Sequence, residues 1–242
     1  MSRGCMTLAQ AADELGVSPG TLKTMAQNGE ISFAMRGENM VFTRDDLDLW
    51  ASQKIVNEGM AGGDGHGPAR PRHEETAHLL SELCPRECVC SALPGSSRAS
   101  IIKALTELAE QSGFLYDPDD LRKEIAKREE CGSTNLGNGV AIPHTMTREE
   151  GYFSQSFIAI AKLATPCYFN SAPDGSKTSL LILSCSSDSN EHLMILQKIS
   201  EICRLTTFLA DVEEAGSDEE IWQALLNAEE ALVRKAGKKR GK

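Results

Sequence analysis

The sequence has 242 residues and a formal net charge of −10 at pH 7, and 40% of its residues are hydrophobic. This length allows one large domain or two smaller ones. No run of eighteen apolar residues occurs, so we expect no transmembrane helix. The first residues, MSRGCMTLAQ, lack an apolar core before a small-residue cleavage site, so we expect no signal peptide and a cytoplasmic protein.

Positive charge is concentrated at the C-terminal end. Residues 234–242, RKAGKKRGK, contain six basic and no acidic residues, so the remainder of the chain is more acidic than the total. An acidic body does not indicate general affinity for nucleic acid. We expect the tail to be a solvated, disordered end, with contact to an acidic partner or to nucleic acid as the alternative.

Eight cysteines are present, and in a cytoplasmic chain they are expected to be reduced thiols. The cluster CPRECVC at residues 84–90 lacks a second C-x-x-C or a nearby Cys/His pair, so it gives little support for zinc. Cys167 and Cys185 lie in strand-like runs, where a thiol serves as a small apolar side chain. We therefore expect no metal and no cofactor.

A Gly- and Pro-rich stretch, MAGGDGHGPARPRHE at residues 60–74, divides the chain. It lacks apolar periodicity and cannot bury a core, which is typical of a linker. We place the linker at residues 56–77, between domains at 1–55 and 78–233, and assign His66 and His73 to it.

The first domain begins with helical signals. Thr7 is a plausible N-cap for a helix that ends at Gly16, and Ser18 caps a second that ends at Gly29. Residues 31–43 predict a hairpin that turns at residues 37–39. RDDLDLW, at residues 44–50, starts a third helix with Leu47 and Trp50 facing inward.

This order of helix, turn, helix and wing, with the run AADELGVSPGTL, resembles the small helix-turn-helix domains of the excisionase and MerR class over residues 6–52. The resemblance implies that the second helix enters the DNA major groove while the wing contacts the backbone. The candidate DNA-binding residues are Thr21, Lys23, Thr24 and Arg36. Residues 1–50 hold only four basic residues against seven acidic ones, so a monomer should bind DNA weakly. A protein-docking or dimerisation module is the alternative.

The second domain shows an α/β pattern. Apolar runs at residues 157–164 and 178–185 predict buried strands. Amphipathic runs at residues 96–113, 117–130, 190–205 and 217–232 predict helices. This mixture predicts a three-layer α/β domain, a mixed sheet flanked by helices on both faces.

His144 follows a glycine-rich loop in the run CGSTNLGNGVAIPHT, residues 131–145. Pro143 fixes the backbone before it, and VAI predicts a short strand. The loop glycines, Gly139 among them, allow close approach to a ligand, and Ser133, Thr134 and Asn135 offer hydrogen bonds. A rigidly held imidazole beside such a loop suits a nucleophile for a phosphoryl group, because its neutral nitrogen attacks without a separate base.

Two motifs extend this interpretation. REECGSTNLGNGVAIPHT (residues 128–145) and SNEHLMILQKISEI (residues 189–202) resemble the signatures of IIA domains of the mannitol/fructose type in the bacterial phosphotransferase system, which include nitrogen-regulatory IIA proteins. The resemblance spans residues 78–233 and implies that His144 is the phospho-acceptor, flanked by His192 and Arg128. Residues Ser133, Thr134, Asn135 and Gly139 would then supply the phosphate cradle. A metal site at the two histidines, or a Cys131 thiol nucleophile, is the weaker alternative.

We therefore expect a cytoplasmic regulatory phosphocarrier, a phosphotransferase component rather than a free-standing turnover enzyme. The resemblance implies phospho-HPr, or its nitrogen-branch counterpart, as donor. Expected downstream partners are DNA, a regulated kinase or transporter, or a IIB protein. The alternatives are a sugar-specific IIA that serves a separate IIB permease protein, and a phosphorylation-independent DNA-binding or scaffold protein.

Overall fold

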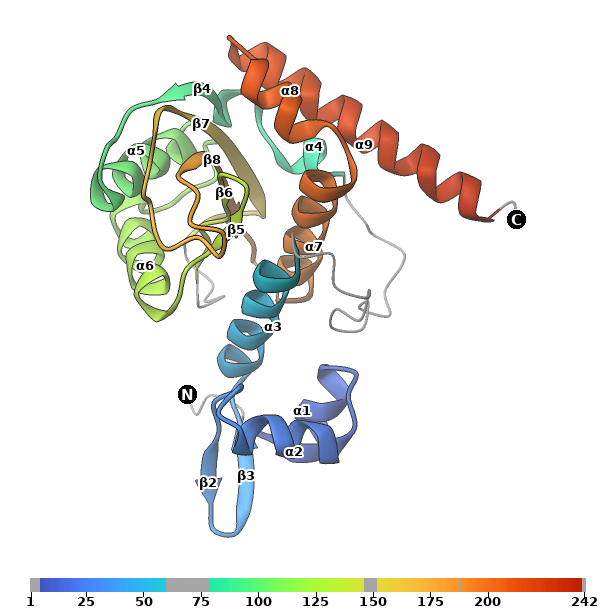
Figure 1. Ribbon diagram of the computed structural model, residues 1–242. Helices are drawn as coiled ribbons and strands as arrows, with labels where there is room; N and C mark the ends of the chain where they lie inside the picture. Colours follow the sequence, from blue (N-terminus) through green and yellow to red (C-terminus); the bar gives the residue numbers. More distant parts are fainter. Residues whose placement is uncertain (1–4, 60–78, 146–151, 188, 241–242) are drawn as a thin grey trace.

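The computed structural model describes residues 5–59, 79–145, 152–187 and 189–240, and these residues form two domains joined by a long helix (Figure 1). The predicted fold class, a small helix-turn-helix domain followed by a three-layer α/β domain, is confirmed. Most of the predicted linker, with His66 and His73, lies outside the described residues. Its first positions, 56–59, are helical and belong to α3 (Arg44–Gly59).

The N-terminal domain has the predicted succession of two helices, a hairpin and a third helix, preceded by a short strand, β1, that was not predicted. Its elements are β1 (Met6–Thr7), α1 (Leu8–Glu14), α2 (Pro19–Gln27), β2 (Ala34–Arg36), β3 (Asn39–Phe42) and α3. The Thr7 hydroxyl accepts a hydrogen bond from the backbone N–H of Gln10, and the Ser18 hydroxyl caps α2 at Thr21. Gly16, with φ of 64°, provides the left-handed turn between the helices.

A small apolar core holds this domain together. Leu22 of α2, Phe42 of β3 and Leu47 of α3 are almost completely buried, and Trp50 is buried beside them. The hairpin of β2 and β3 turns at residues 37–38 and projects from this core as the wing (Figure 1). The helix-turn-helix geometry therefore rests on the apolar spacing read from the sequence.

The second domain contains the remaining elements. They are α4 (Leu80–Leu83), η1 (Arg86–Cys88), β4 (Val89–Leu93), α5 (Arg98–Glu110), α6 (Pro118–Cys131), β5 (Asn135–Gly137), β6 (Val140–Ala141), β7 (Phe157–Cys167), β8 (Thr178–Cys185), α7 (Ser189–Leu205), α8 (Phe208–Glu214) and α9 (Asp218–Arg240). The strands form a five-stranded sheet in the order β4-β7-β8-β6-β5. It is mixed: β7 and β8 pair antiparallel, whereas β4 with β7 and β6 with β8 pair parallel.

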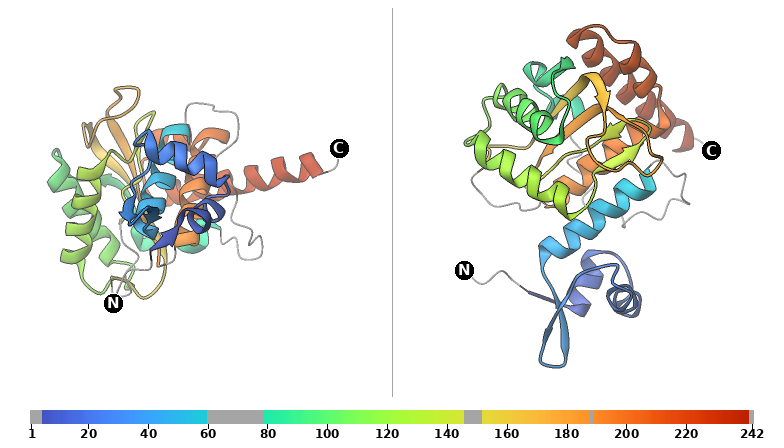
Figure 2. Two further views of the ribbon diagram at one scale, coloured as in Figure 1. Left: turned by 90° about the horizontal axis from the view of Figure 1, so that it is seen from below. Right: turned by 60° about the vertical axis from the view of Figure 1, so that its left-hand side comes forward.

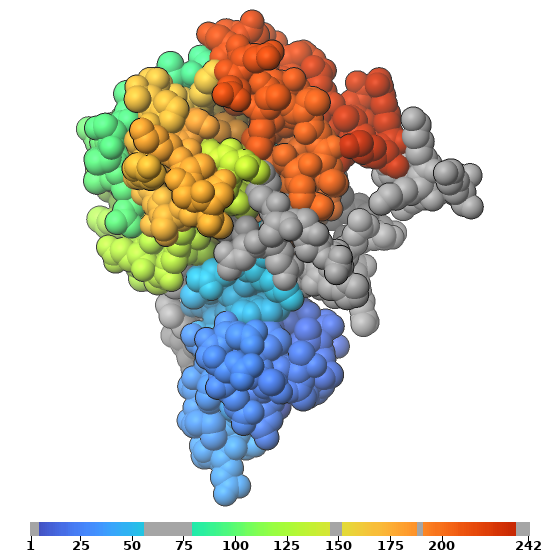
Figure 3. All heavy atoms as spheres, in the orientation of Figure 1, coloured from blue at the N-terminus to red at the C-terminus, as the bar shows by residue number. Residues whose placement is uncertain are grey.

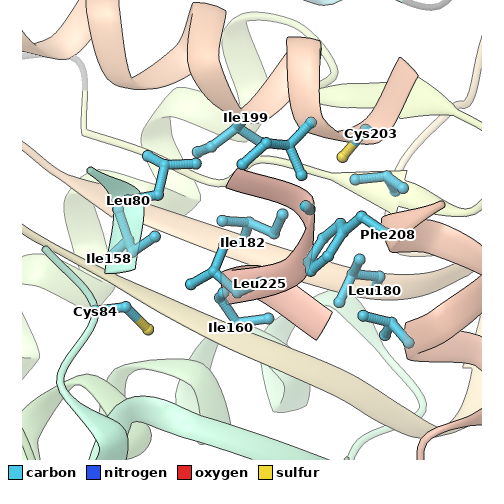
Figure 4. Packing of buried hydrophobic residues seen from close by; sticks show 14 of the residues in the cluster. Leu80, Cys84, Ile158, Ile160, Leu180, Ile182, Ile199, Cys203, Phe208 and Leu225 are labelled. Carbon is cyan, nitrogen blue, oxygen red and sulfur yellow. The ribbon is translucent and has the colours of Figure 1, made fainter. Parts of the chain in front are cut away.

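Successive side chains of the central strands point to opposite faces of the sheet, and an apolar layer covers each face. Ile158 and Ile160 of β7 point into a cluster with α7, α8 and α9, which Figure 4 shows around Ile199, Phe208 and Leu225. Ala159 and Ala161 point to the opposite face, toward α5 and α6. Both faces of the sheet are covered, as the continuous apolar strands predict.

The helices and strands differ from the sequence-based expectation in two ways. Helix α9 continues to Arg240, so most of the basic tail expected to be disordered is helical, and it projects from the body of the domain (Figures 1 and 2). Strands β1, β4 and β5, helices α4 and α8 and the short helix η1 were not predicted, because elements this short carry a weak periodic signal. In the described part of the chain, no helix is long and apolar enough to cross a membrane.

Helix α3 connects the two domains physically. Its Leu47 and Trp50 lie in the N-terminal core, whereas its Ile55 lies in the core of the α/β domain. In return, Leu193 of α7 packs against the N-terminal core. In the space-filling view α3, in cyan, lies between the N-terminal core and the α/β domain (Figure 3). Within the α/β domain, α3 packs mainly against α7.

Candidate functional site

His144 lies just beyond β6, at the C-terminal end of β8. It forms a parallel bridge with Ser184, whose backbone N–H donates to the carbonyl of Pro143 at 2.9 Å. The N–H of Ile142 donates to Thr134 at 3.0 Å. The backbone on both sides of the imidazole is therefore fixed, and Pro143 adds a locked φ angle.

The hydrogen bonds of His144 define its tautomer. Nδ1 lies 2.8 Å from the carbonyl oxygen of Ile142, which only accepts, so Nδ1 carries the hydrogen. Nε2 therefore presents a lone pair, and it accepts a hydrogen bond from Nε of Arg128 at 3.0 Å. Of the two ring nitrogens, Nε2 is therefore the one with a lone pair that can act as a nucleophile.

Arg128 stands in the last turn of α6 and is 1% exposed. It continues the apolar stripe of Leu121 and Ile125 at helical spacing, which turns it inward. Its Nη1 donates to the carbonyl of Gly132 at 2.9 Å, while Nη2 is buried without a hydrogen-bond partner among the described residues. Burial lowers the pKa of Arg128, and the neighbouring Glu129 carboxylate opposes that shift. An arginine still keeps its charge, so the buried Nη2 amino group remains available to donate to an anion.

His192 comes from the first turn of α7 and is also 1% exposed. Its ring centroid lies 4.9 Å from that of His144. Its Nε2 lies 3.1 Å from the hydroxyl of Ser52 on α3. The α7 N-terminus favours a negative charge beside these rings. The structure therefore brings the three predicted core residues, His144, His192 and Arg128, to one place.

The polar loop after α6 is organised by a buried carboxylate, Glu129, which is 2% exposed. It accepts hydrogen bonds from the hydroxyl of Thr134 and, at 2.7 Å, from the side-chain amide of Asn170. Burial raises the pKa of Glu129, and these hydrogen bonds and the charge of Arg128 oppose the shift. Asn135 donates to the carbonyl of Asn170 at 3.1 Å and accepts from Thr178 at 3.1 Å.

The predicted phosphate cradle is thus brought together only in part. The side chains of Thr134 and Asn135 are occupied in holding the loop, and the Ser133 hydroxyl accepts from the N–H of Asn135 at 3.2 Å. Gly139 lies at the β5–β6 turn, where it contacts Ser179 at the start of β8. His144 pairs with Ser184 at the other end of that strand, so the structure does not bring Gly139 to the histidines.

Three residues of the site were missed from sequence: Ser52, Glu129 and Asn170. Glu129 had a signal, because the helical stripe through Leu121 and Ile125 reaches positions 128 and 129. Ser52 had none, because it comes from the other domain.

The four candidate DNA-binding residues are exposed in the N-terminal domain: Thr21, Lys23, Thr24 and Arg36. The first three lie on α2 and Arg36 lies on the wing. The hydroxyl of Thr24 donates to the carbonyl of Gly20 at 3.1 Å, and that of Thr21 pairs with Ser18 at 2.8 Å. Only Lys23 and Arg36 of this set carry the positive charge that phosphate contacts require.

The cluster CPRECVC lies in and beside the core. Cys84 and Cys88 are buried, and burial raises the pKa of Cys84 and raises that of Cys88 to about 12. Both thiols therefore stay protonated near neutral pH, which makes them poor nucleophiles. Within the described ranges, no third His, Cys, Asp or Glu joins the two site histidines to form a set that could hold a metal ion.

Comparison with known families gives two matches. Residues 82–228 match the family described as "Phosphoenolpyruvate-dependent sugar phosphotransferase system, EIIA 2". Residues 5–54 match the family described as "Helix-turn-helix domain".

Individual relatives agree with the first match. The chain is 30% identical over 159 residues to a nitrogen regulatory protein of Escherichia coli, which covers 65% of this chain and 95% of the relative. It is 32% identical over 129 residues to the mannitol-specific phosphotransferase enzyme IIA component of Geobacillus stearothermophilus, an alignment that covers 53% of this chain and 85% of the relative. The solved structure of nitrogen regulatory protein IIA-Ntr from Neisseria meningitidis superposes with a TM-score of 0.54 at 26% identity, covering 61% of this chain and 99% of that one.

Proposed function

Because the chain belongs to the EIIA 2 family of the phosphoenolpyruvate-dependent sugar phosphotransferase system, we propose that it is a regulatory phosphocarrier, with the phosphoryl group on Nε2 of His144. One observation carries the proposal: Nδ1 donates to Ile142, so Nε2 holds the lone pair, and it faces the buried guanidinium of Arg128. A nucleophile and a fixed cation are the two groups that phosphoryl transfer requires of a protein.

The transfer balances without a further reactant. The donor is a phosphohistidine whose other ring nitrogen is protonated. Its P–N bond breaks, and the electron pair returns to that donor ring, which leaves neutral. A P–N bond forms to Nε2 of His144, which gives up the hydrogen bond it accepted from Nε of Arg128, while Nδ1 keeps its hydrogen bonded to the carbonyl of Ile142. The positive charge thus passes from one ring to the other. The proposed donors to the phosphoryl oxygens are Nη2 of Arg128, which is buried without a hydrogen-bond partner among the described residues, and His192, whose ring centroid lies 4.9 Å from that of His144.

Phospho-HPr or its nitrogen-branch counterpart is the proposed donor. The similarity to proteins named nitrogen regulatory protein supports a signalling role. The attached helix-turn-helix domain supports an output through DNA or through a protein partner such as a kinase or transporter. Phosphorylation adds nearly two negative charges, and this added charge is proposed to change binding by the N-terminal domain.

A second candidate is a IIA component that passes the phosphoryl group to a IIB protein during sugar uptake. The similarity to a mannitol-specific IIA component favours this alternative. The two candidates share the chemistry at His144 and differ in the acceptor. Rapid transfer to a IIB protein with sugar-dependent dephosphorylation would select the second. A binding function unchanged in His144→Gln would select the phosphorylation-independent alternative.

The proposal is tested by incubating the full chain with phosphoenolpyruvate, Enzyme I and HPr and measuring its intact mass. One acid-labile phosphoryl adduct is expected on the wild-type chain and on the control His73→Gln, a linker histidine. His144→Gln should show none. An adduct on His144→Gln, or no adduct on the folded wild-type chain with either donor, contradicts the proposal.

A further inference from the structure

The two site histidines are closed off from solvent, and a helix of the N-terminal domain contacts one of them, His192. His144 and His192 are each 1% exposed. The hydroxyl of Ser52 on α3 lies 3.1 Å from Nε2 of His192, although 140 residues separate them in sequence. Figure 1 shows α3 running beside α7, the helix that carries His192.

Further contacts seat α3 at this position. Ile55 is 6% exposed and packs into the core cluster of the α/β domain. Gln53 lies against the loop that follows α6, where a Cβ on Gly132 would be only 2.9 Å from its Nε2. Gly132 also accepts the hydrogen bond from Arg128. Helix α3 therefore contacts the surroundings of both His192 and Arg128.

We propose that α3 occupies the face on which the phosphoryl donor docks, and that it leaves this face when His144 carries the phosphoryl group. The inference rests on the proposed phosphorylation of His144 and identifies its regulatory output. The occupant is a segment of this chain, residues 52–55, which competes with the donor.

Access gives the first reason for competition. In-line transfer between two imidazoles requires the donor phosphorus to come within about 3–3.5 Å of the accepting nitrogen. A donor protein cannot bring its phosphohistidine to a ring that is 1% exposed while Ser52 lies against the neighbouring ring. Donor docking therefore requires α3 to move. The apparent affinity for the donor then equals the intrinsic affinity multiplied by the fraction of molecules in which α3 has moved away.

The contact between Ser52 and His192 gives the second reason. Nε2 of His192 lies 3.1 Å from the Ser52 hydroxyl, and the His192 ring centroid lies 4.9 Å from that of His144. A phosphoryl group of nearly two negative charges is a stronger hydrogen-bond acceptor than a hydroxyl. When His192 donates to a phosphoryl oxygen on His144, that bond replaces the contact with Ser52 that holds α3 at this site.

Release of α3 carries the N-terminal domain with it. The opposite side of the helix holds Leu47 and Trp50 in the helix-turn-helix core, so α3 and that core move as one unit. In the unphosphorylated protein the domain is held against the carrier. In the phosphorylated protein it is tethered by the chain alone, and α2 and the wing gain orientational freedom for a partner.

The test uses the full chain and measures two quantities. The first is the initial rate of His144 phosphorylation at subsaturating phospho-HPr for wild type, Ile55→Asp and the matched control Ile55→Val. If about nine in ten molecules are docked, Ile55→Asp should raise this rate about tenfold, whereas Ile55→Val should leave it near the wild-type value. The second is amide hydrogen exchange of α3 in wild type before and after phosphorylation, with faster exchange in residues 52–59 expected afterwards.

The outcomes separate this inference from the proposed function. Equal phosphorylation rates in all three chains, together with unchanged exchange of α3 after phosphorylation, overturn the role of α3 and leave phosphorylation of His144 standing. If neither wild type nor Ile55→Asp takes up a phosphoryl group, the proposed function itself fails. The exchange measurement needs no substitution, so a folding defect in Ile55→Asp does not block the test.

Discussion

The substitution Arg128→Lys keeps the charge at the site but removes its geometry. The guanidinium donates hydrogen bonds to Nε2 of His144 at 3.0 Å and to the carbonyl of Gly132 at 2.9 Å. Its Nη2 has no hydrogen-bond partner among the described residues. A single ammonium cannot reach all three positions. Loss of one fixed donor to the transferring group lowers a rate by about 10²–10³-fold. A buried acceptor left without its donor costs about 1–3 kcal/mol of folding free energy.

Two assays separate these effects. Single-turnover phosphorylation by excess phospho-HPr gives the rate, and urea unfolding gives the free energy of unfolding. Arg122→Lys is the matched control, because Arg122 lies on the same helix and pairs with Asp119 at the surface; it should change neither quantity appreciably. If Arg128→Lys is phosphorylated at the wild-type rate, then the guanidinium does not stabilise the transferring group and the assigned role of Arg128 is wrong.

Further expectations concern the loop, acid stability and DNA. Thr134→Val removes the hydroxyl that donates to buried Glu129 and should lower the free energy of unfolding by about 1–3 kcal/mol in a urea titration; no loss would mean that this bond is not important for the fold. Hydrogen bonds from Asn138 and Ser176 lower the pKa of Asp174 to about 2, so this carboxylate stabilises the fold above its ordinary pKa and ceases to do so as the pH falls from about 4 to 2. Asp174→Asn should therefore reduce the slope of stability against pH in that window, and an unchanged slope would contradict this. If the N-terminal domain binds DNA, Lys23→Gln should reduce the salt-dependence slope of binding by about one, and an unchanged slope would remove that phosphate contact.

Local signals predicted most of the fold. Thr7 and Ser18 are observed as N-caps, and the apolar runs at residues 157–164 and 178–185 are the central strands. Their success follows from the short range of these signals: capping and periodicity depend on neighbours in sequence. The prediction for the basic tail was wrong because it relied on local charge alone, which indicated disorder. The helix that begins at Asp218 continues through the tail to Arg240.

The candidate site was predictable where a motif lies within one segment. His144 after Pro143, with Arg128 sixteen residues before it, belongs to one such segment. The partners that join distant segments were not predictable: Asn170 on Glu129, and Ser52 on His192 across the domain boundary. For Gly139 the sequence predicted a site residue that the structure places away from the histidines. Its glycine-rich context indicated a ligand loop, whereas its φ of 79° serves the hairpin turn beside Ser179.

Nε2 of His144 is the atom proposed to accept the phosphoryl group. The most direct measurement is NMR of the phosphorylated full chain with ¹⁵N-labelled histidine, in which the coupling of phosphorus to ring nitrogen identifies the modified atom. We expect one phosphohistidine, phosphorylated at Nε2 and absent from His144→Gln, because Nδ1 donates its hydrogen to Ile142. A phosphoryl group on Nδ1, or on any other residue, would contradict the geometry from which the function was inferred.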